Sequence, residues 1–146
     1  MKNKNLIDEE LSPAGLFRYL AAIFYDSLLL LSVLFLAAAL AYPFSQGQVN
    51  FIFRIYLLIV CFFYFAWPWL HGGQTLGMKA WYIRLQATDG KVLTWRHVLL
   101  RFSMAIVSWS TLGIGVLWML VDKQQRTWHD KVSNTCLVRL VIISKT

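Results

Sequence analysis

Asp26 places a carboxylic acid in the middle of a long apolar segment. Residues 16–41 otherwise contain mainly aliphatic and aromatic side chains, with Arg18 near their beginning. An ionisable side chain inside a membrane costs several kcal/mol unless it is neutralised, hydrated or paired. Asp26 is therefore a candidate for a group that binds a proton or a polar solute. A permanent ion pair that only holds helices together is the alternative interpretation.

Arg101 is the partner that the sequence predicts for Asp26, because it begins a third apolar segment and can project toward the membrane interior. Arg18 comes eight positions before Asp26. On a helix this corresponds to about 12 Å along the axis and about 80° around it, too far for direct contact. We expect Arg18 to reach lipid phosphates or Asp122 instead, and a simple positive anchor at the cytoplasmic surface is the alternative.

A polar stretch near the end of the chain adds further titratable groups. Asp122 precedes Lys123, and a local pair between them at the surface is the alternative to a functional role. His129 and Asp130 are adjacent. A histidine beside a carboxylate suits a proton relay near neutral pH, although such neighbours are also common as hydrogen-bonded pairs at protein surfaces.

No catalytic arrangement follows from these residue types. The paired aspartates of intramembrane proteases need an aspartate directly after a Gly-x-Gly motif, and Val116 occupies that position here. The sequence also contains no motif that pairs a nucleophile with a base, and no phosphate-binding loop. No zinc or iron motif matches the spacing of the three histidines, His71, His97 and His129. We therefore expect no enzymatic activity, no cofactor and no metal.

Membrane helices must position these groups. Of the 146 residues, 58% are hydrophobic and 14% are charged, against about 45–50% and about 25% in soluble domains. One small core cannot enclose so many apolar side chains. About 20 apolar residues cross the hydrocarbon as a helix. We therefore predict spans at residues 16–41 and 51–70 and a third helical segment at residues 97–121.

The distribution of positive charge predicts how these helices are oriented. Residues 42–50 contain no Lys or Arg, whereas residues 122–146 contain five. Basic residues accumulate on the cytoplasmic side, so residues 42–50 should face outward and the N-terminus should be cytoplasmic. A third complete crossing would carry the basic tail outward. We therefore favour a segment that re-enters, bent at Gly113 and Gly115, over a complete crossing.

Short β-structure is expected on the cytoplasmic side. Glycines in residues 71–79 mark a connection after the second span. Residues 81–95 alternate in part around Asp89-Gly90, which predicts a β-hairpin. Residues 135–140 have strand character and can join the hairpin as a third strand.

The predicted fold class is thus an all-α membrane protein with two transmembrane helices, a Gly-bent third segment and a small cytoplasmic β element. A polar N-terminal segment, residues 1–15, precedes this single membrane domain, residues 16–141.

Several of these features occur together in a known family. They are Arg18, Asp26, the connection Gly72-Gly73-Gln74-Thr75-Leu76-Gly77-Met78-Lys79, Asp89-Gly90, Arg101, Leu112-Gly113-Ile114-Gly115, and Asp122 followed by Trp128-His129-Asp130. Over about residues 13–140 the chain resembles the RDD family, which is named after one arginine and two aspartates. The resemblance implies that Arg18 and Asp26 are the first two of these residues and that the last is Asp122 or Asp130. It also implies a multi-pass protein of the bacterial inner membrane, in a family often supposed to act in transport.

From these observations we expect a protein that helps to move a proton, an ion or a small polar solute. Asp26 would be the titrating or binding group, and Arg18, Arg101 and Asp122 would set its field. Two spans and one partial segment can hardly enclose a pathway, so we expect a homo-oligomer or a larger membrane complex. The alternative is a structural or accessory module whose basic inner face binds anionic lipid head groups or another membrane protein. In a membrane protein the net charge of +7 indicates cytoplasmic loops near lipid and no nucleic-acid partner.

Overall fold

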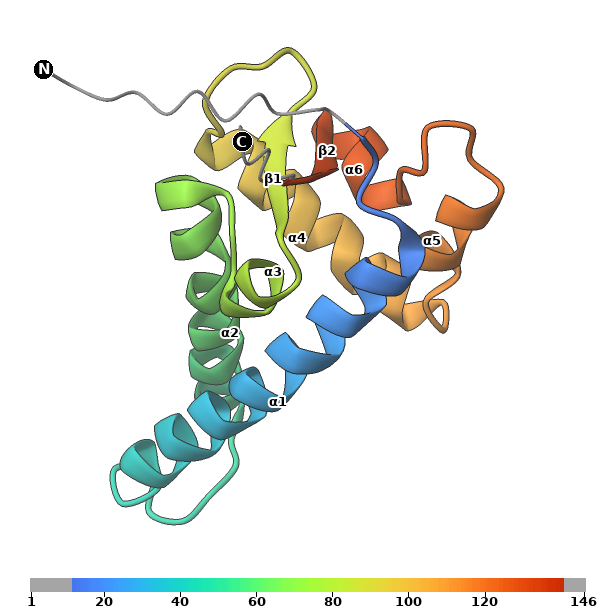
Figure 1. Cartoon of the computed structure of the whole chain (residues 1–146). Coiled ribbons are helices and arrows are strands. Elements are labelled where there is room, and N and C mark those ends of the chain that lie inside the picture. The colour runs from blue at the N-terminus through green and yellow to red at the C-terminus, as the bar shows by residue number, and fades with distance from the viewer. Residues whose placement is uncertain (1–11, 141–146) are drawn as a thin grey trace, which may run out of the picture.

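The computed structural model describes residues 12–140 and consists mainly of helices (Figure 1). Most of the N-terminal segment expected over residues 1–15, and residue 141, lie outside the described residues. Two helices, α1 (Leu16–Ala41) and α2 (Phe51–Gly72), are long and apolar enough to cross a membrane. They confirm the two predicted spans, and α2 continues two residues beyond the expected end.

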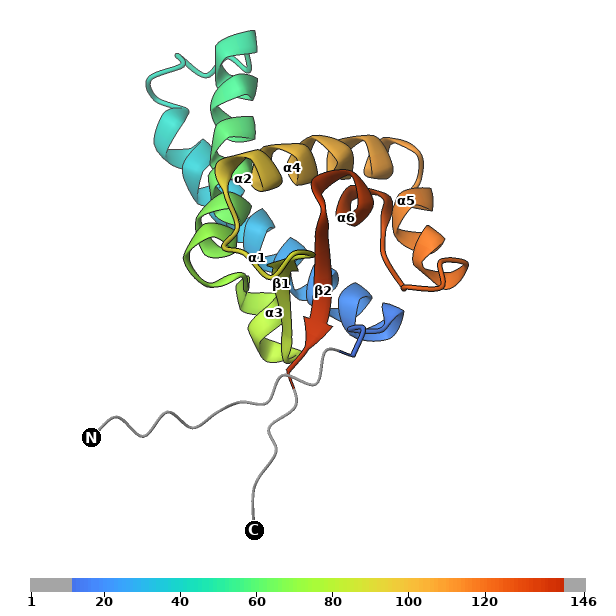
Figure 2. The same ribbon diagram turned by 90° about the horizontal axis from the view of Figure 1, so that it is seen from above.

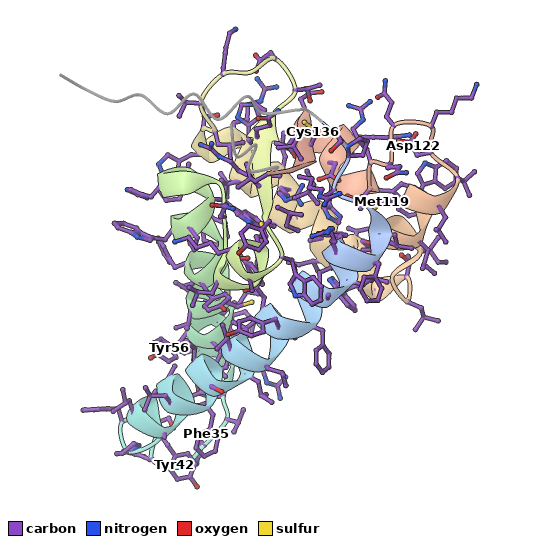
Figure 3. The ribbon with its side chains drawn as sticks, in the orientation of Figure 1. Phe35, Tyr42, Tyr56, Met119, Asp122 and Cys136 are labelled. Atoms are coloured by element: carbon purple, nitrogen blue, oxygen red, sulfur yellow. The ribbon has the colours of Figure 1, made fainter. Side chains whose placement is uncertain are left out.

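The two long helices expose apolar side chains over most of their surfaces. Phe17, Phe35 and Phe51 are each more than 70% exposed. Exposed apolar surface of this extent is unfavourable in water and indicates contact with lipid. At the connection between the helices, the side chain of Asn50 accepts a hydrogen bond of 2.9 Å from the backbone N–H of Phe53 and so starts α2. Figure 3 shows Phe35 and Tyr42 near this connection, with Asp122 and Cys136 at the opposite end of the molecule.

The third helical segment is sharply bent. It comprises α4 (Trp95–Ser110), α5 (Ile114–Leu117) and the 3-10 helix η1 (Trp118–Leu120), and the bend is 107°. Gly113 has a φ of 77°, a backbone conformation that glycine adopts without strain. The predicted glycine bend is therefore confirmed at Gly113. Gly115 lies beyond the bend, where it packs against the side chain of Ser108.

The small sheet pairs strands that are distant in the sequence. Strand β1 (Ile83–Ala87) runs antiparallel to β2 (Thr135–Arg139), with Ile83 opposite Arg139 and Ala87 opposite Thr135. The tail strand is thus confirmed, but the hairpin expected over residues 81–95 is wrong. Thr94, which should have extended the second hairpin strand, instead precedes α4 and donates its backbone N–H to Nδ1 of His97 at 3.1 Å. Because a helix begins here, residues 91–94 do not form a strand. Among residues 12–140, β1 therefore pairs only with β2.

The chain returns after the bend to the end of the molecule where α4 began. Helix α6 (Trp128–Ser133) leads into β2, and in both Figure 1 and Figure 2 β2 lies between β1 and α6. The backbone N–H of Ala14 also donates to the carbonyl of Leu137 at 3.2 Å. The beginning of α1, the connection after α2 and the tail therefore meet at one end of the fold.

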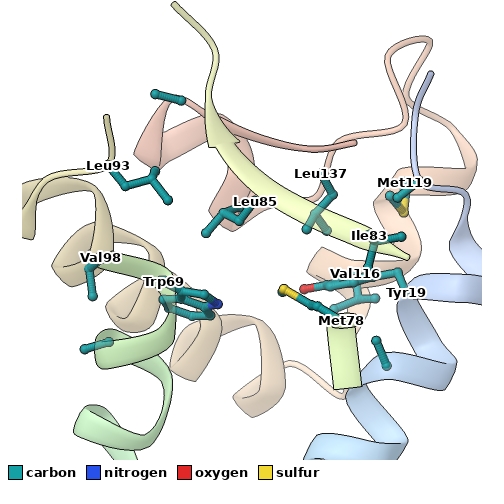
Figure 4. Close-up of a cluster of buried hydrophobic side chains, with 14 residues drawn as sticks. Tyr19, Trp69, Met78, Ile83, Leu85, Leu93, Val98, Val116, Met119 and Leu137 are labelled. Carbon is teal, nitrogen blue, oxygen red and sulfur yellow. The ribbon is translucent and has the colours of Figure 1, made fainter. Parts of the chain in front are cut away.

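An apolar core lies beneath this sheet. Its side chains come from both strands and from helices α1, α2, α4 and α5, as Figure 4 shows for Tyr19, Trp69, Ile83, Leu85, Val98, Val116 and Leu137. The short helix α3 (Leu76–Ala80) adds Met78 to the same cluster. The core therefore packs the beginning of α1 and the end of α2 against the sheet.

Candidate functional site

Asp26 is buried in α1 and is held by three hydrogen-bond donors. Its Oδ1 accepts from the backbone N–H of Gly77 at 2.9 Å and from the hydroxyl of Tyr64 at 3.4 Å, and its Oδ2 accepts from the hydroxyl of Thr75. The side chain is only 4% exposed. Within residues 12–140 Asp26 has no ion-pair partner. The predicted pair with Arg101 is therefore wrong, because hydroxyl and backbone groups from α2 and α3 occupy the carboxylate.

The glycine-rich connection supplies two of these donors. Thr75 is the N-cap of α3: its hydroxyl oxygen accepts from the backbone N–H of Met78 at 3.2 Å while the same hydroxyl donates to Asp26. Gly77 allows α3 to approach α1 closely, since a Cβ there would lie 2.4 Å from the carbonyl oxygen of Ala22 and 2.8 Å from Cγ of Asp26. The glycine-rich connection predicted after the second span thus contains a short helix, and this helix packs against the buried aspartate.

Arg101 forms its ion pair with Asp130, and both side chains are almost completely buried. The same guanidinium nitrogen donates to the hydroxyl of Thr135 at 3.1 Å. Asp130 begins α6 together with Thr127, whose backbone N–H donates to Oδ2 of Asp130 at 3.0 Å. The Cζ of Arg101 lies 5.2 Å from the centre of the Trp69 ring, a cation–π contact. The pair therefore links α4 to α6 and to the end of α2.

The Arg101 guanidinium also keeps Asp130 ionised. Burial alone raises the pKa of a carboxyl group, but here the opposite charge of Arg101 and the hydrogen bonds from Arg101 and Thr127 hold the pKa of Asp130 below its ordinary value. A buried charge of each sign is thus compensated by its neighbour.

His129 is buried rather than exposed at the surface. Its Nε2 lies 2.7 Å from the hydroxyl of Tyr19, and it does not pair with the adjacent Asp130. Burial and the nearby charge of Arg101 lower the pKa of His129 to about 3. The imidazole is therefore neutral near pH 7, which does not match the proton relay near neutral pH that the sequence suggested.

Arg18 and Asp122 lie at the periphery, and they do not pair with each other. Arg18 donates to the backbone carbonyl of Trp81 at 3.2 Å. Asp122 pairs with Lys131 at 2.6 Å and not with Lys123 or Arg18, because α6 folds back over the end of η1. The Lys131 ammonium and the backbone N–H of Arg126 hold the pKa of Asp122 below its ordinary value.

A cavity of about 590 Å³ brings three of the six predicted site residues together. Asp26, Arg101 and His129 line it, whereas Arg18, Asp122 and Asp130 do not. Most of its wall is apolar and comes from α1, α2 and α4, with Ala22, Ile23, Leu30, Leu58, Phe65, Phe102, Ala105, Ile106 and Trp109 among the lining residues. The volume falls within the range of about 300–1,000 Å³ that is typical of small-molecule sites.

Sequence reasoning missed four residues that complete this site. Tyr19 contacts His129, Tyr64 and Thr75 donate to Asp26, and Trp69 lies under the guanidinium of Arg101. Thr75 had a usable signal, because a threonine just before a short helix is a typical N-cap. Trp69 lies within the predicted second span, and nothing in its local sequence indicated a contact with α4.

The fold and the cavity define a small helical membrane protein with a sharply bent third segment and a charged cluster buried near one end. A model of the RDD family matches residues 13–134, which is most of the chain, and the protein therefore belongs to the RDD family. Neither the curated proteins nor the solved structures that were compared contain a match to it.

Proposed function

We propose that this RDD-family protein moves a proton, an ion or a small polar solute across the membrane, with the cavity as its binding place. The observation that supports the proposal is the position of Asp26, a buried carboxylate that lines the cavity and has no cation partner within the described part of the chain. We propose a binding role rather than a catalytic one for this group.

The environment of Asp26 suits reversible binding. The donors from Tyr64, Thr75 and Gly77 stabilise a carboxylate but do not neutralise its charge. An ionised group at this depth gains stability when a proton, a cation or a hydrated solute reaches it. A change of occupant at Asp26 would thereby alter the affinity of the cavity for a second solute, which is the coupling that transport needs.

The proposed location is the bacterial cytoplasmic membrane with the N-terminus inside. Basic residues surround the end of the fold that carries the sheet, including Lys79, Arg96, Lys123 and Arg139, whereas residues 42–50 at the other end have none. By the positive-inside rule, this distribution supports a cytoplasmic position for the sheet. In this orientation α4 and α5 form a re-entrant segment, since β2 returns to β1 on the side where α4 starts.

A complete pathway would require more than one copy or a larger complex. The long helices and the bent segment leave large apolar side chains exposed, among them Leu112 and Leu120 near the bend. We propose that other copies of the chain, a larger membrane complex or lipid cover these surfaces, and that anionic head groups contact the basic end.

Purified full-length protein in vesicles with an internal pH or ion dye tests the proposal. Wild-type vesicles should show flux along an imposed gradient, and Asp26→Asn should reduce it to the level of empty vesicles. Ala105→Trp, which fills the cavity without changing a charge, should also block flux. Asp89→Asn changes an exposed carboxylate outside the cavity and should leave flux unchanged.

Flux that survives in a folded Asp26→Asn variant would refute the transport role of this carboxylate. Retained secondary structure and an unchanged elution volume in detergent establish that the variant is folded. No flux from the wild type, together with co-purification of another membrane protein, would favour the accessory module.

A further inference from the structure

Three buried polar atoms around the cavity have no hydrogen-bond partner among residues 12–140. They are Nε1 of Trp69, Nε of Arg101 and Nδ1 of His129. These side chains come from α2, α4 and α6, are all more than 90% buried, and all line the cavity. A buried polar atom without a partner costs about 1–3 kcal/mol, so three such atoms on side chains that line one cavity are unusual in a folded protein.

These atoms belong to one connected cluster, which we name the donor pole. The guanidinium of Arg101 lies over the Trp69 ring and pairs with Asp130, the residue next to His129. Figure 4 shows the indole nitrogen of Trp69 on the side of its ring that faces Met78 and Tyr19. The hydroxyl of Tyr19 in turn contacts Nε2 of His129.

The chemistry of the donor pole selects an acceptor. Tryptophan Nε1 and arginine Nε each carry a hydrogen and can only donate. When the Tyr19 hydroxyl donates to Nε2 of the neutral His129, the imidazole hydrogen is on Nδ1, which makes a third donor. A group that satisfies all three must therefore offer oxygen lone pairs.

The charge balance of the site selects an uncharged acceptor. The positive charge of Arg101 is already compensated by Asp130, and His129 is neutral. Asp26 comes seven positions after Tyr19 on α1, about 10 Å along the helix on nearly the same face, and its carboxylate disfavours a second anion in the cavity. A cation would be attracted to Asp26 but would leave the three donors unsatisfied.

We propose that the cavity binds an uncharged amphiphilic solute whose polar end offers oxygen acceptors, a carbonyl among them, to the unpartnered donors of Trp69, Arg101 and His129. Its apolar body lies against the wall that includes Ile23, Phe65 and Phe102. This inference rests on the proposed function, because it names the class of polar solute that the site selects.

Three small aromatic probes that differ in charge and in their polar group test this selection. Benzamide is uncharged with a carbonyl oxygen, benzoate is its anionic counterpart, and benzylamine is cationic. The full chain in lipid nanodiscs, labelled with ¹⁵N at the tryptophan indoles, gives separate N–H signals. Benzamide should move the Trp69 indole proton downfield in a saturable way, and benzoate and benzylamine should bind at least about tenfold more weakly.

Two substitutions on the same helix provide the matched comparison. Trp69→Phe keeps the ring but removes the donor, and should weaken benzamide binding about tenfold, as expected for one lost hydrogen bond. The indole signal of Trp109, which also lines the cavity, reports binding in that variant. Trp67→Phe, on an exposed side chain outside the cavity, should bind benzamide like the wild type. Ala105→Leu narrows the cavity and should also weaken binding while the donor pole is unchanged.

Equal binding of the three probes, or no movement of the Trp69 signal with benzamide, would overturn the inference. Wild-type affinity in both Trp69→Phe and Ala105→Leu would do the same. Benzamide binding without any flux in vesicles would refute the proposed transport function but would still support the donor pole as a binding site. Flux that depends on Asp26, without any benzamide binding, would refute only the proposed role of the donor pole and would leave the transport proposal standing.

Discussion

The guanidinium of Arg101 and the carboxylate of Asp130 form an ion pair between side chains that are 1% and 0% exposed. Twenty-nine positions of sequence separate the two residues, and the bend at Gly113 lies between them. The pair therefore fixes how the returning chain packs against α4. It also holds Arg101 at the cavity wall, where the guanidinium contacts Trp69.

Loss of either partner of this pair should be strongly destabilising. Asp130→Asn or Arg101→Met leaves one buried charge uncompensated, which typically costs about 3–5 kcal/mol. The double variant Arg101→Met/Asp130→Leu removes both charges and should recover part of that loss. Thermal unfolding in detergent, monitored by circular dichroism, ranks the stability of the three variants. Single variants as stable as the wild type would contradict the burial of the pair.

Thr75 should stabilise the fold through its hydroxyl. Thr75→Val keeps the shape of the side chain but removes the donor to Asp26 and the N-cap of α3, with an expected cost of about 1–3 kcal/mol. Thr75→Ser retains the hydroxyl and should lose much less. Unfolding temperatures of the two variants, compared under the same conditions, decide whether the hydroxyl or the methyl group matters.

Gly77 and Gly72 should respond differently to the same substitution. A Cβ at Gly77 meets the backbone of α1, so Gly77→Ala must push α3 away from Asp26 and should cost about 1–3 kcal/mol. A Cβ at Gly72 has no neighbouring atom within 4 Å, so Gly72→Ala is the matched control and should be tolerated. Similar unfolding temperatures for both variants would show that α3 does not pack as tightly as described.

His129 should make the fold less stable in acid. Its pKa is about 3 in the folded protein and has an ordinary value of 6.5. Between these values the unfolded chain binds a proton that the folded chain does not, so stability falls as the pH decreases from about 6.5 toward 3. Unfolding temperatures between pH 7.5 and 4.5 should decrease less for His129→Gln than for the wild type. His71→Gln, on an exposed side chain, should retain the wild-type slope.

Cysteine labelling tests the proposed orientation. In a background with Cys61→Ala and Cys136→Ser, single cysteines replace exposed residues at opposite ends of the fold, Gln46→Cys and Arg139→Cys. An impermeant maleimide added to intact cells should label position 46, and should label position 139 only after the membrane is opened. Labelling of position 139 from outside would reverse the orientation or require a third complete crossing.

The spans, the bend and the tail strand could be predicted because their causes are local. The length of an apolar run decides whether it can cross the membrane as a helix. Gly113 permits a backbone angle that few other residues adopt. The resemblance to the RDD family likewise rested on short motifs. The predicted hairpin failed for a local reason too, since Thr94 and His97 start a helix where alternation alone suggested a strand.

The partners of the charged residues could not be predicted in this way. An ion pair between Asp26 and Arg101 was predicted because both residues lie in apolar segments. Apolar composition, however, does not determine how one helix is rotated about its axis relative to another. The observed partners depend on where α3 docks and on how far α6 returns. The unsatisfied nitrogen of Trp69 depends on the same packing, so no pattern within α2 could reveal it.

Pairing of β1 with β2 also dictates an order of assembly. β2 follows every other described helix and strand in the chain, so during synthesis α1 and α2 reach the bilayer while β1 still lacks its partner. Contacts between residues so far apart in sequence form late. The sheet can therefore close only after every helix that lines the cavity has been synthesised.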